Sequence, residues 1–396
     1  MPVVDTLDID ALRADTPGCA HRVHLNNAGA ALMPEPVLKA CRDHLTQEAT
    51  HGGYEAAAEA KTALEDTYDA VAALLQCHRD EVALMENATR AWDMAFYSLS
   101  FDEGDRILTS EASYASNYLA FLQQRRRTGV EIVTIPRDDH GQIDLDALEA
   151  AIDDRTALIA LTHVPTNNGL VNPAAEVGRL ARAAGVPFLL DACQSAGQRP
   201  LDVDAIGCDM LSATSRKYLR GPRGMGFLYV RRALIETMEP PIIDLHAATW
   251  TGPDSYTLRA DARRFETWEK NYAAQLGLRA AVRYALDLGL DAIQEAVQAR
   301  AARLRGLLGD VPAVTVQDTG AVQSGIVTFT VDGQPAAEVQ QALRAQHINV
   351  SVSPPSSTLL DATRRSLPPL VRASVHYYNT TDELDVLQQA LLSLTT

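Results

Sequence analysis

Short apolar runs alternate with amphipathic stretches through the first two-thirds of the chain. Six runs rich in Val, Ile, Leu, Phe and Ala predict strands, at residues 106–109, 131–135, 157–164, 186–190, 209–213 and 226–230. Residues 145–152 and 174–184, which lie between these runs, carry apolar side chains at helical spacing. Apolar strands separated by amphipathic helices are typical of βαβ units around a buried, mostly parallel sheet. The pattern therefore predicts an α/β domain whose ligands bind beyond the carboxyl ends of the strands.

The pattern changes after residue 230. It predicts helices at residues 272–289, 290–308 and 337–346 and strands at 325–331, 348–351 and 370–374. Such a mixture predicts a small α+β domain with an antiparallel sheet. We therefore expect an N-terminal segment that joins the small domain (1–24), a large domain with a mostly parallel mixed sheet flanked by helices (25–270) and a small C-terminal domain (271–396).

Composition narrows the function classes. The chain has 396 residues, and 35 Lys and Arg against 51 Asp and Glu give a formal net charge of −16. Such a surface repels phosphate backbones, which argues against nucleic acid as the main partner. The N-terminus has no apolar signal segment, and no run of about 18 apolar residues suggests a membrane span. We expect a soluble cytoplasmic protein.

Cysteine usage agrees with that expectation. The five cysteines are scattered, odd in number and without a CxxC pair: Cys19, Cys41, Cys77, Cys193 and Cys208. Neither a disulfide framework nor a zinc site is indicated, and no metal is expected.

Asp191 ends the apolar run of FLLDACQSAG, residues 188–197. A carboxylate at the end of a buried strand is unfavourable unless a positive group meets it. A pyridinium nitrogen would be such a group, and its protonation makes the ring an electron sink. Taken alone, Asp191 is better explained as a helix-capping residue in a loop than as a cofactor ligand.

Lys217 lies in the hydroxyl-rich turn of LSATSRKYLRGPRGMGFLYV, residues 211–230. The glycines of this segment allow close backbone approach, and Thr214, Ser215 and Arg216 can contact a phosphate. A lysine that is desolvated and close to other cations has a lowered pKa and can attack an aldehyde. A single loop lysine is usually a solvated surface residue, but the pairing with Asp191 favours the functional interpretation.

A third motif is MENATRAWDMAF, residues 85–96. Asn87, Ala88 and Thr89 precede a predicted helix, whose free N–H groups form a natural phosphate cradle. By itself this is a common helix start.

Taken in chain order, which is MENATRAWDMAF, EASYASN, FLLDACQSAG, LSATSRKYLRGPRGMGFLYV and VRASVHYYNT, the motifs resemble the class V aminotransferase family. That family comprises fold type I enzymes with pyridoxal 5′-phosphate (PLP), among them cysteine desulfurases, selenocysteine lyases and isopenicillin N epimerases. The likeness extends from LNNAGAALMP near Leu25 to RASVHYYNTTDEL near Arg372.

The resemblance implies the residues that hold the cofactor ring. Lys217 resembles the Schiff-base lysine, Asp191 the partner of the pyridinium nitrogen, and Gln194 the residue that hydrogen-bonds the ring O3′. Tyr114 stands in the place of the ring-stacking histidine, where it can stack but cannot be the same proton donor. Relatives place an asparagine near O3′ where this chain has Thr166, with Asn167 adjacent, and the sequence leaves open which of the two faces the ring.

The resemblance also implies phosphate and substrate contacts. Phosphate binding falls to Ala88, Thr89, Thr214 and Arg216. Arg372 is similar to the arginine that grips the substrate α-carboxylate, a role suited to a bidentate fork, although an ordinary strand-end arginine is the alternative. The N-terminal residues that resemble the lining of the substrate pocket are Asn26, Asn27 and Ala28.

Two departures from the family pattern concern the partner subunit and sulfur. The family implies a homodimer in which a partner threonine often contacts the phosphate, but the matching stretch here contains Glu269, Lys270 and Asn271. Desulfurases carry a cysteine in the loop before the carboxylate-binding arginine, whereas no cysteine follows Cys208 here. We expect Cys193 to be a buried structural residue.

Without a sulfur-accepting cysteine, resemblance to the thiol-independent lyases of the family implies β-elimination, of the C–S lyase type, on a small-molecule cysteine-derived amino acid without persulfide chemistry. Transamination and epimerisation remain alternatives within the family. Arg364 and Arg365 would either bind an acidic substrate tail or be solvated charges. A non-catalytic PLP-fold binding protein is a remote alternative because Lys217 and Asp191 are both present, and no G-x-G-x-x-G or Walker motif supports nucleotide binding.

Overall fold

A seven-stranded mixed sheet forms the centre of the molecule, in the order β2-β8-β7-β6-β5-β3-β4. The computed structural model describes residues 7–395, so the first six residues of the expected N-terminal segment lie outside it. The strands are β2 (Val82–Met85), β3 (Arg106–Ser110), β4 (Glu131–Ile135), β5 (Thr156–Thr162), β6 (Phe188–Asp191), β7 (Met210–Thr214) and β8 (Gly226–Val230). Strands β4, β3, β5, β6 and β7 run parallel, and β8 is antiparallel to both of its neighbours. The expected α/β fold with a mostly parallel mixed sheet is confirmed.

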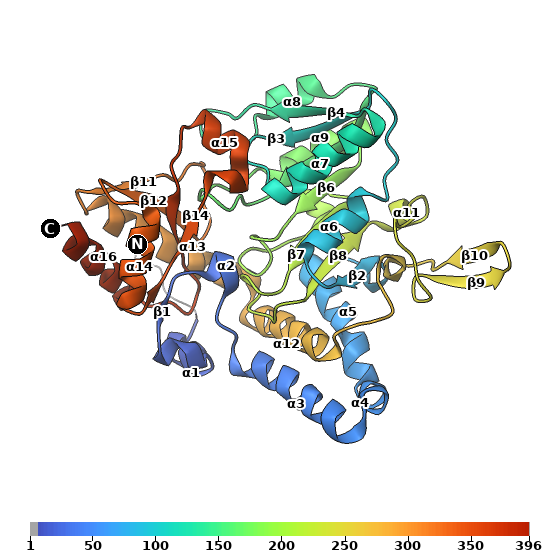
Figure 1. Ribbon diagram of the computed structural model, residues 1–396, viewed down its shortest axis with the longest axis horizontal. Coiled ribbons are helices and arrows are strands. Elements are labelled where there is room, and N and C mark those ends of the chain that lie inside the picture. Colours follow the sequence, from blue (N-terminus) through green and yellow to red (C-terminus); the bar gives the residue numbers. More distant parts are fainter. Residues whose placement is uncertain (1–6, 396) are drawn as a thin grey trace.

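Alternate residues of the central strands fill two separate cores, as the pleat requires. Leu158 and Leu189 belong to the core under α6 and α7, whereas Ile159 and Leu190 belong to the core that includes α5, α9 and α12. The helices of this layered region are α5 (Lys61–Leu75), α6 (Ala88–Phe96), α7 (Ala115–Thr128), α8 (Leu145–Ala151), α9 (Ala174–Ala184), α10 (Val203–Ile206), α11 (Arg232–Ile235) and α12 (Tyr272–Leu288). Helices thus flank the sheet on both faces (Figure 1).

The C-terminal part contains a four-stranded antiparallel sheet in the order β11-β12-β15-β14. Its elements are β11 (Val314–Val316), β12 (Ile326–Val331), β14 (Ser351–Ser353), β15 (Leu370–Ser374), α13 (Leu290–Gly309), α14 (Ala336–Ala345), α15 (Leu359–Arg364) and α16 (Thr381–Thr395). The predicted strand 348–351 is divided: β13 (Ile348–Asn349) pairs in parallel with β1 (Val23–His24), and β14 pairs with β15.

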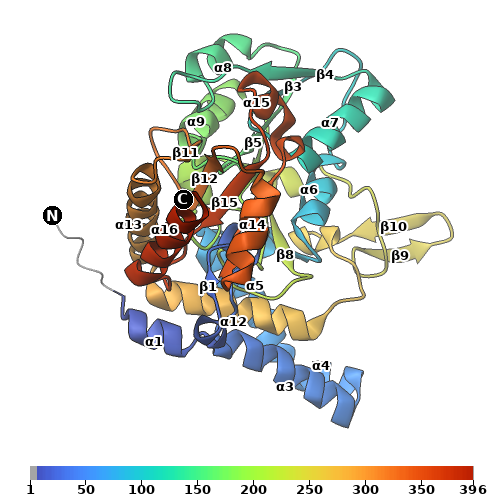
Figure 2. The same ribbon diagram turned by 60° about the vertical axis from the view of Figure 1, so that its left-hand side comes forward.

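The remaining elements lie at the N-terminus and in one projecting hairpin. The N-terminal helices are α1 (Ile9–Ala14), α2 (Asn27–Ala30), α3 (Glu35–His51) and α4 (Gly53–Glu59), and four 3₁₀ turns occur at Pro17–Ala20, Arg79–Glu81, Ala262–Phe265 and Pro355–Thr358. Figure 2 shows α3 beside α12. Strands β9 (Ala248–Gly252) and β10 (Ser255–Leu258) form a hairpin that projects away from the body (Figure 1). No helix within residues 7–395 is both long and apolar enough to cross a bilayer.

Candidate active site

A cavity of about 360 Å³ opens at the carboxyl ends of β6 and β7. It is lined by Asn87, Ala88, Thr89, Tyr114, Asn117, Asp191, Cys193, Ser212, Thr214, Arg216 and Lys217. Seven of the residues predicted for the cofactor site therefore meet in one place, although they come from segments far apart in the sequence.

Asp191 is the last residue of β6 and is almost completely buried. Its Oδ1 accepts a hydrogen bond from the Cys193 backbone N–H at 3.0 Å, and its Oδ2 accepts one from Asn117 Nδ2 at 2.8 Å. No Lys, Arg or His among residues 7–395 lies within 4.0 Å of this carboxylate. A buried carboxylate without a cation is expensive, so the site favours a cationic ligand atom here.

Lys217 follows β7 and lines the same cavity. Burial lowers the pKa of its amine, and the guanidinium groups of Arg216 and Arg372 lower it further, against the opposing influence of Cys193 and Asp191. A lowered pKa increases the fraction of neutral amine, which is the form that attacks a carbonyl and accepts a proton.

The first turn of α6 also lines the cavity. Asn87 caps this helix by accepting a hydrogen bond from the Arg90 N–H at 3.0 Å, which leaves the N–H groups of Ala88 and Thr89 without an intrahelical acceptor. Gly226 lets this turn lie against the sheet, because a Cβ there would be 3.1 Å from Ala88 N and 2.5 Å from the Ala213 carbonyl oxygen. The arrangement suits a phosphate group.

Two further predicted phosphate ligands lie beside that turn. The Thr214 hydroxyl donates to the Met225 carbonyl at 3.4 Å, a long contact that a better acceptor can replace. The Arg216 guanidinium donates to the Gly29 carbonyl oxygen, which joins the lysine turn to the N-terminal segment.

Arg372 lies on β15 and is 9% exposed. Its Nε donates to Ser351 Oγ at 3.1 Å, and its Nη1 donates to the hydroxyl and the carbonyl oxygen of Thr166. Burial lowers the pKa of this guanidinium to about 10, so it remains charged at neutral pH. Within the described residues it has no carboxylate partner inside 4.0 Å. An anionic substrate group would supply the missing partner.

Thr166 and Asn167 point to different surroundings. The Thr166 hydroxyl lies beside Arg372 and Gln194, whose Nε2 is 3.4 Å away. Asn167 is buried, accepts from Ser353 Oγ at 2.5 Å and donates to the Pro354 carbonyl at 3.3 Å. Of the two residues, Thr166 faces the side of the site where Arg372 and Gln194 lie.

The three N-terminal residues predicted to line the substrate pocket have different surroundings. The Ala28 N–H donates to Ser374 Oγ, and the Ala28 carbonyl accepts from Gln194 Nε2 at 3.1 Å. Asn27 is fully buried, and its amide bonds the His24 and Ser374 carbonyls and the Tyr378 hydroxyl, so its side chain anchors the segment. Asn26 Oδ1 is buried and accepts no hydrogen bond from the part of the chain that the structure describes.

Tyr114 lines the cavity and is 38% exposed. It is the N-cap residue of α7, and its backbone N–H donates to Thr162 Oγ1 at 3.1 Å. This anchors the residue at the rim while its ring stays free to stack on a ligand.

Besides Asn87, which caps α6, three residues that line the cavity were not predicted as ligands: Asn117, Cys193 and Ser212. Burial and the neighbouring Asp191 raise the pKa of the Cys193 thiol, which disfavours the reactive thiolate. Ser212 pairs with Asp191 across β6 and β7, so strand alternation could have identified it. Asn117 had no local signal, because its partner Asp191 is 74 residues away.

The loop between β14 and β15 contains no cysteine and folds into a 3₁₀ turn and α15. Its arginines are occupied: Arg364 pairs with Glu111, and Arg365 lies 3.5 Å from Asp361.

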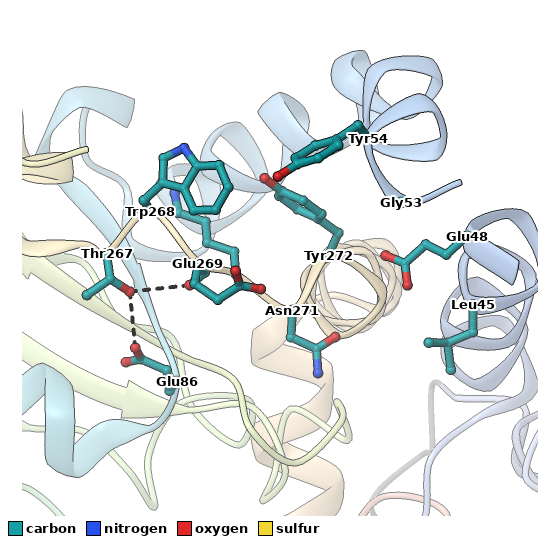
Figure 3. A pocket seen from close by; sticks show the side chains of 11 residues that line it. Leu45, Glu48, Gly53, Tyr54, Glu86, Thr267, Trp268, Glu269, Asn271 and Tyr272 are labelled. Atoms are coloured by element: carbon teal, nitrogen blue, oxygen red, sulfur yellow. Dashed lines mark hydrogen bonds between the residues drawn. The ribbon is translucent and has the colours of Figure 1, made fainter. Parts of the chain in front are cut away.

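A larger groove of about 810 Å³ is lined by residues other than those around Lys217 (Figure 3). Tyr54, Trp268 and Tyr272 line it together with Glu269 and Asn271, from the stretch where the family pattern is absent. The larger of the two cavities is not the reactive site, because neither Lys217 nor Asp191 lines it.

The smaller cavity fits PLP. The unpaired Asp191 carboxylate suits a ring N–H, the start of α6 suits the phosphate, and Lys217 suits the aldehyde. Gln194 adds a buried Oε1 that accepts no hydrogen bond from residues 7–395.

Comparison with known proteins gives the same result. The sequence model of the class-V aminotransferases matches residues 23–387. A probable cysteine desulfurase of Halobacterium salinarum is 30% identical over 408 residues, which covers 97% of this chain and 96% of that protein. The apo cysteine desulfurase from Thermococcus onnurineus NA1 aligns with a TM-score of 0.91 at 26% identity and 98% coverage of both chains. The cystine C–S lyase C-DES, solved with cysteine persulfide, shares the fold with a TM-score of 0.86 at 24% identity, covering 95% of this chain and 99% of that one. This chain therefore belongs to the class-V aminotransferase family of fold type I enzymes, and its cofactor is pyridoxal 5′-phosphate.

Proposed function

We propose that this protein is a C–S lyase that carries PLP as a Schiff base on Lys217 and acts on a cysteine-derived amino acid. The overall reaction is R–S–CH₂–CH(NH₃⁺)–COO⁻ + H₂O → R–SH + CH₃–CO–COO⁻ + NH₄⁺. The Cα–H and Cβ–S bonds break, and water supplies the ketone oxygen of pyruvate. PLP supplies the electron sink that makes the Cα proton acidic.

The absence of cysteine from residues 354–369 is the observation that carries this proposal. A desulfurase of this family needs a thiol there to take the sulfur atom. The one cysteine that lines the cavity is Cys193, and its raised pKa makes it a poor sulfur acceptor. Release of a free thiol product needs no such residue.

The surrounding side chains have roles that suit this reaction. Arg372 binds the substrate α-carboxylate through its fork, and Thr166 holds that guanidinium in place. Lys217 Nζ takes the Cα proton, because a lowered pKa leaves more of the amine neutral once it is released. Asp191 holds the ring nitrogen protonated.

The test is an assay of products from the PLP-loaded protein with L-cysteine, L-cystine and an S-alkyl-L-cysteine. We expect equal amounts of pyruvate and ammonia, no alanine, and complete loss of activity in Lys217→Ala. Lys39→Ala, on exposed α3, is the matched control.

The other outcomes contradict the proposal in distinct ways. Alanine formed with protein-bound sulfur would indicate a desulfurase, in agreement with the names of the relatives. Conversion to the pyridoxamine form without pyruvate would indicate a transaminase, and inversion at Cα without other products an epimerase. Bound PLP with no turnover of any amino acid would indicate a binding protein.

A further inference from the structure

Asn117 contacts the buried aspartate from a separate element. Its Nδ2 lies 2.8 Å from Asp191 Oδ2, and the two side chains belong to residues that are 5% and 4% exposed. The sequence patterns gave it no role.

The Asp191 carboxylate is held by one donor on each oxygen. The Cys193 N–H occupies Oδ1 and the Asn117 amide occupies Oδ2. Each carboxylate oxygen accepts about two hydrogen bonds, so acceptor capacity remains on both. Two donors on opposite oxygens fix the plane of the carboxylate and thereby the direction of the remaining lone pairs.

The two donors are not equivalent. The Cys193 N–H is two residues from Asp191 and belongs to the same strand end. Asn117 belongs to the first turn of α7, the turn that starts at Tyr114. That turn is anchored to the sheet by the hydrogen bond from the Tyr114 N–H to Thr162 Oγ1. The same helical turn therefore contains Tyr114, the predicted stacking residue, and contacts Asp191 through Asn117.

We propose that Asn117 is a positioning residue that orients Asp191 toward the ring nitrogen of the cofactor. This rests on the proposed placement of the ring at Asp191 and Lys217, but it does not depend on which reaction the enzyme catalyses. The neutral amide fixes the carboxylate without neutralising it, whereas a lysine or arginine at this position would compete with the pyridinium for the negative charge. Cys193 and Lys217 interact electrostatically with Asp191; Arg216 acts on both of these groups, and Arg372 acts on Lys217.

The experiment compares Asn117→Leu, of similar size but without a donor, with Asp191→Asn and with Gln124→Leu. Gln124 lies on the same helix, half-exposed and away from the cavity, and serves as the matched control. Two quantities are measured on each protein: the dissociation constant for PLP and the pH midpoint of the Schiff-base absorbance. Asn117→Ser, whose hydroxyl is too short to reach Asp191, serves if the leucine variant does not fold.

We expect Asn117→Leu to weaken PLP binding about tenfold or more, the loss of one hydrogen bond to a charged group. Its Schiff-base midpoint should rise, because a ring nitrogen that is less protonated no longer disfavours the positive imine. Asp191→Asn should change both quantities in the same direction and further, and Gln124→Leu neither.

An Asn117→Leu protein with both quantities unchanged, beside an altered Asp191→Asn protein, would overturn the positioning role alone. If Asp191→Asn also had no effect, the proposed placement of the ring would fail together with the inference. A change in PLP affinity without a shift of the midpoint would show a packing role and would overturn the proposal as well.

Discussion

At the scale of single residues, Arg372 is the most informative side chain. A guanidinium that is 9% exposed and bonded only to hydroxyl and carbonyl oxygens is destabilising for the folded protein. Proteins usually pair such a charge with a carboxylate. Here the partner is missing from the described chain, which supports the view that the ligand brings it.

We predict that Arg372→Gln raises KM for the amino-acid substrate by about tenfold to a hundredfold, the loss of a hydrogen-bonded charge pair. Steady-state assays over a range of substrate concentrations measure this. Arg364→Gln is the control, because Arg364 pairs with Glu111, does not line the cavity and should leave KM unchanged. A similar KM increase in both variants would point instead to an acidic substrate tail held by Arg364.

At this scale, the sequence predicts which side chains lie together best where the strand pattern fixes their position. Asp191 and Thr214 end consecutive parallel strands, so their side chains had to meet at one edge of the sheet. Thr166 and Asn167 could not be distinguished, because in a loop a small change of backbone angles decides which neighbour faces the site. Asn117 lies in a helix whose contact with β6 depends on tertiary packing that no local pattern encodes.

At the scale of elements, Glu266 links segments that the sequence separates widely. Its carboxylate is buried and accepts from the Leu84 N–H of β2 at 2.7 Å, from the Tyr68 hydroxyl of α5 at 2.9 Å, from His246 at 3.0 Å and from Lys270. Burial alone would raise the pKa of Glu266, but the bonds from His246 and Lys270 outweigh it and lower the pKa.

This lowered pKa predicts an acid-sensitive contribution to stability. The folded pKa lies below the ordinary value of 4.5, so the stabilisation is complete above pH 4.5 and is lost progressively as the pH falls from there through the lower folded pKa. Glu266→Gln should lower the free energy of unfolding by about 3 kcal/mol at pH 7 and much less at pH 3. Urea unfolding at both pH values measures this, and an equal loss at both would contradict the assignment.

Gly226 at the start of β8 predicts a second effect at this scale. In Gly226→Ala the new methyl group would lie 2.5 Å from the Ala213 carbonyl oxygen and 3.1 Å from Ala88 N, so α6 must move away from the sheet. We expect PLP affinity to fall at least tenfold, because the phosphate cradle is displaced. Gly306→Ala, in α13 with open space around it, should leave PLP binding unchanged. Equal affinities of the two variants would refute the cradle.

Six of the seven strands of the central sheet followed from periodicity, and the failures have physical causes. The strands at residues 131–135, 226–230 and 370–374 were predicted with their observed ends. Strand β2 was not predicted, since four buried residues after a 3₁₀ turn give too short a pattern. The predicted strand 348–351 is two strands because Ile348 pairs with Val23, a partner more than three hundred residues away.

At the scale of the whole molecule, the aromatic residues near the hairpin separate into two groups. Phe265 is completely buried and fills the core. Trp250 is 81% exposed on β9, Tyr256 is 47% exposed on β10, and Trp268 is 42% exposed in the larger groove. Large exposed aromatic surfaces are typical of interaction sites.

We predict a homodimer that buries Trp250, so that Trp250→Ala weakens the dimer about thirtyfold, the loss of a central interface residue. Sedimentation velocity over a range of concentrations measures the effect. Val386→Ala, exposed on α16, is the control. A wild-type protein that sediments as a monomer would contradict the dimer, and an unchanged Trp250→Ala dimer would place the interface elsewhere.

The N-terminal segment contacts both the lysine turn of the large sheet and strand β15 near the C-terminus. Ala28 and Gly29 receive bonds from Gln194 and Arg216, while Ser374, two residues beyond Arg372, holds the Ala28 N–H. During synthesis the ribosome therefore adds the start of α6 and the lysine turn well before it adds Arg372, the proposed substrate ligand. A chain that stops before β15 thus contains Lys217 and Asp191 but lacks the arginine proposed to bind the substrate carboxylate.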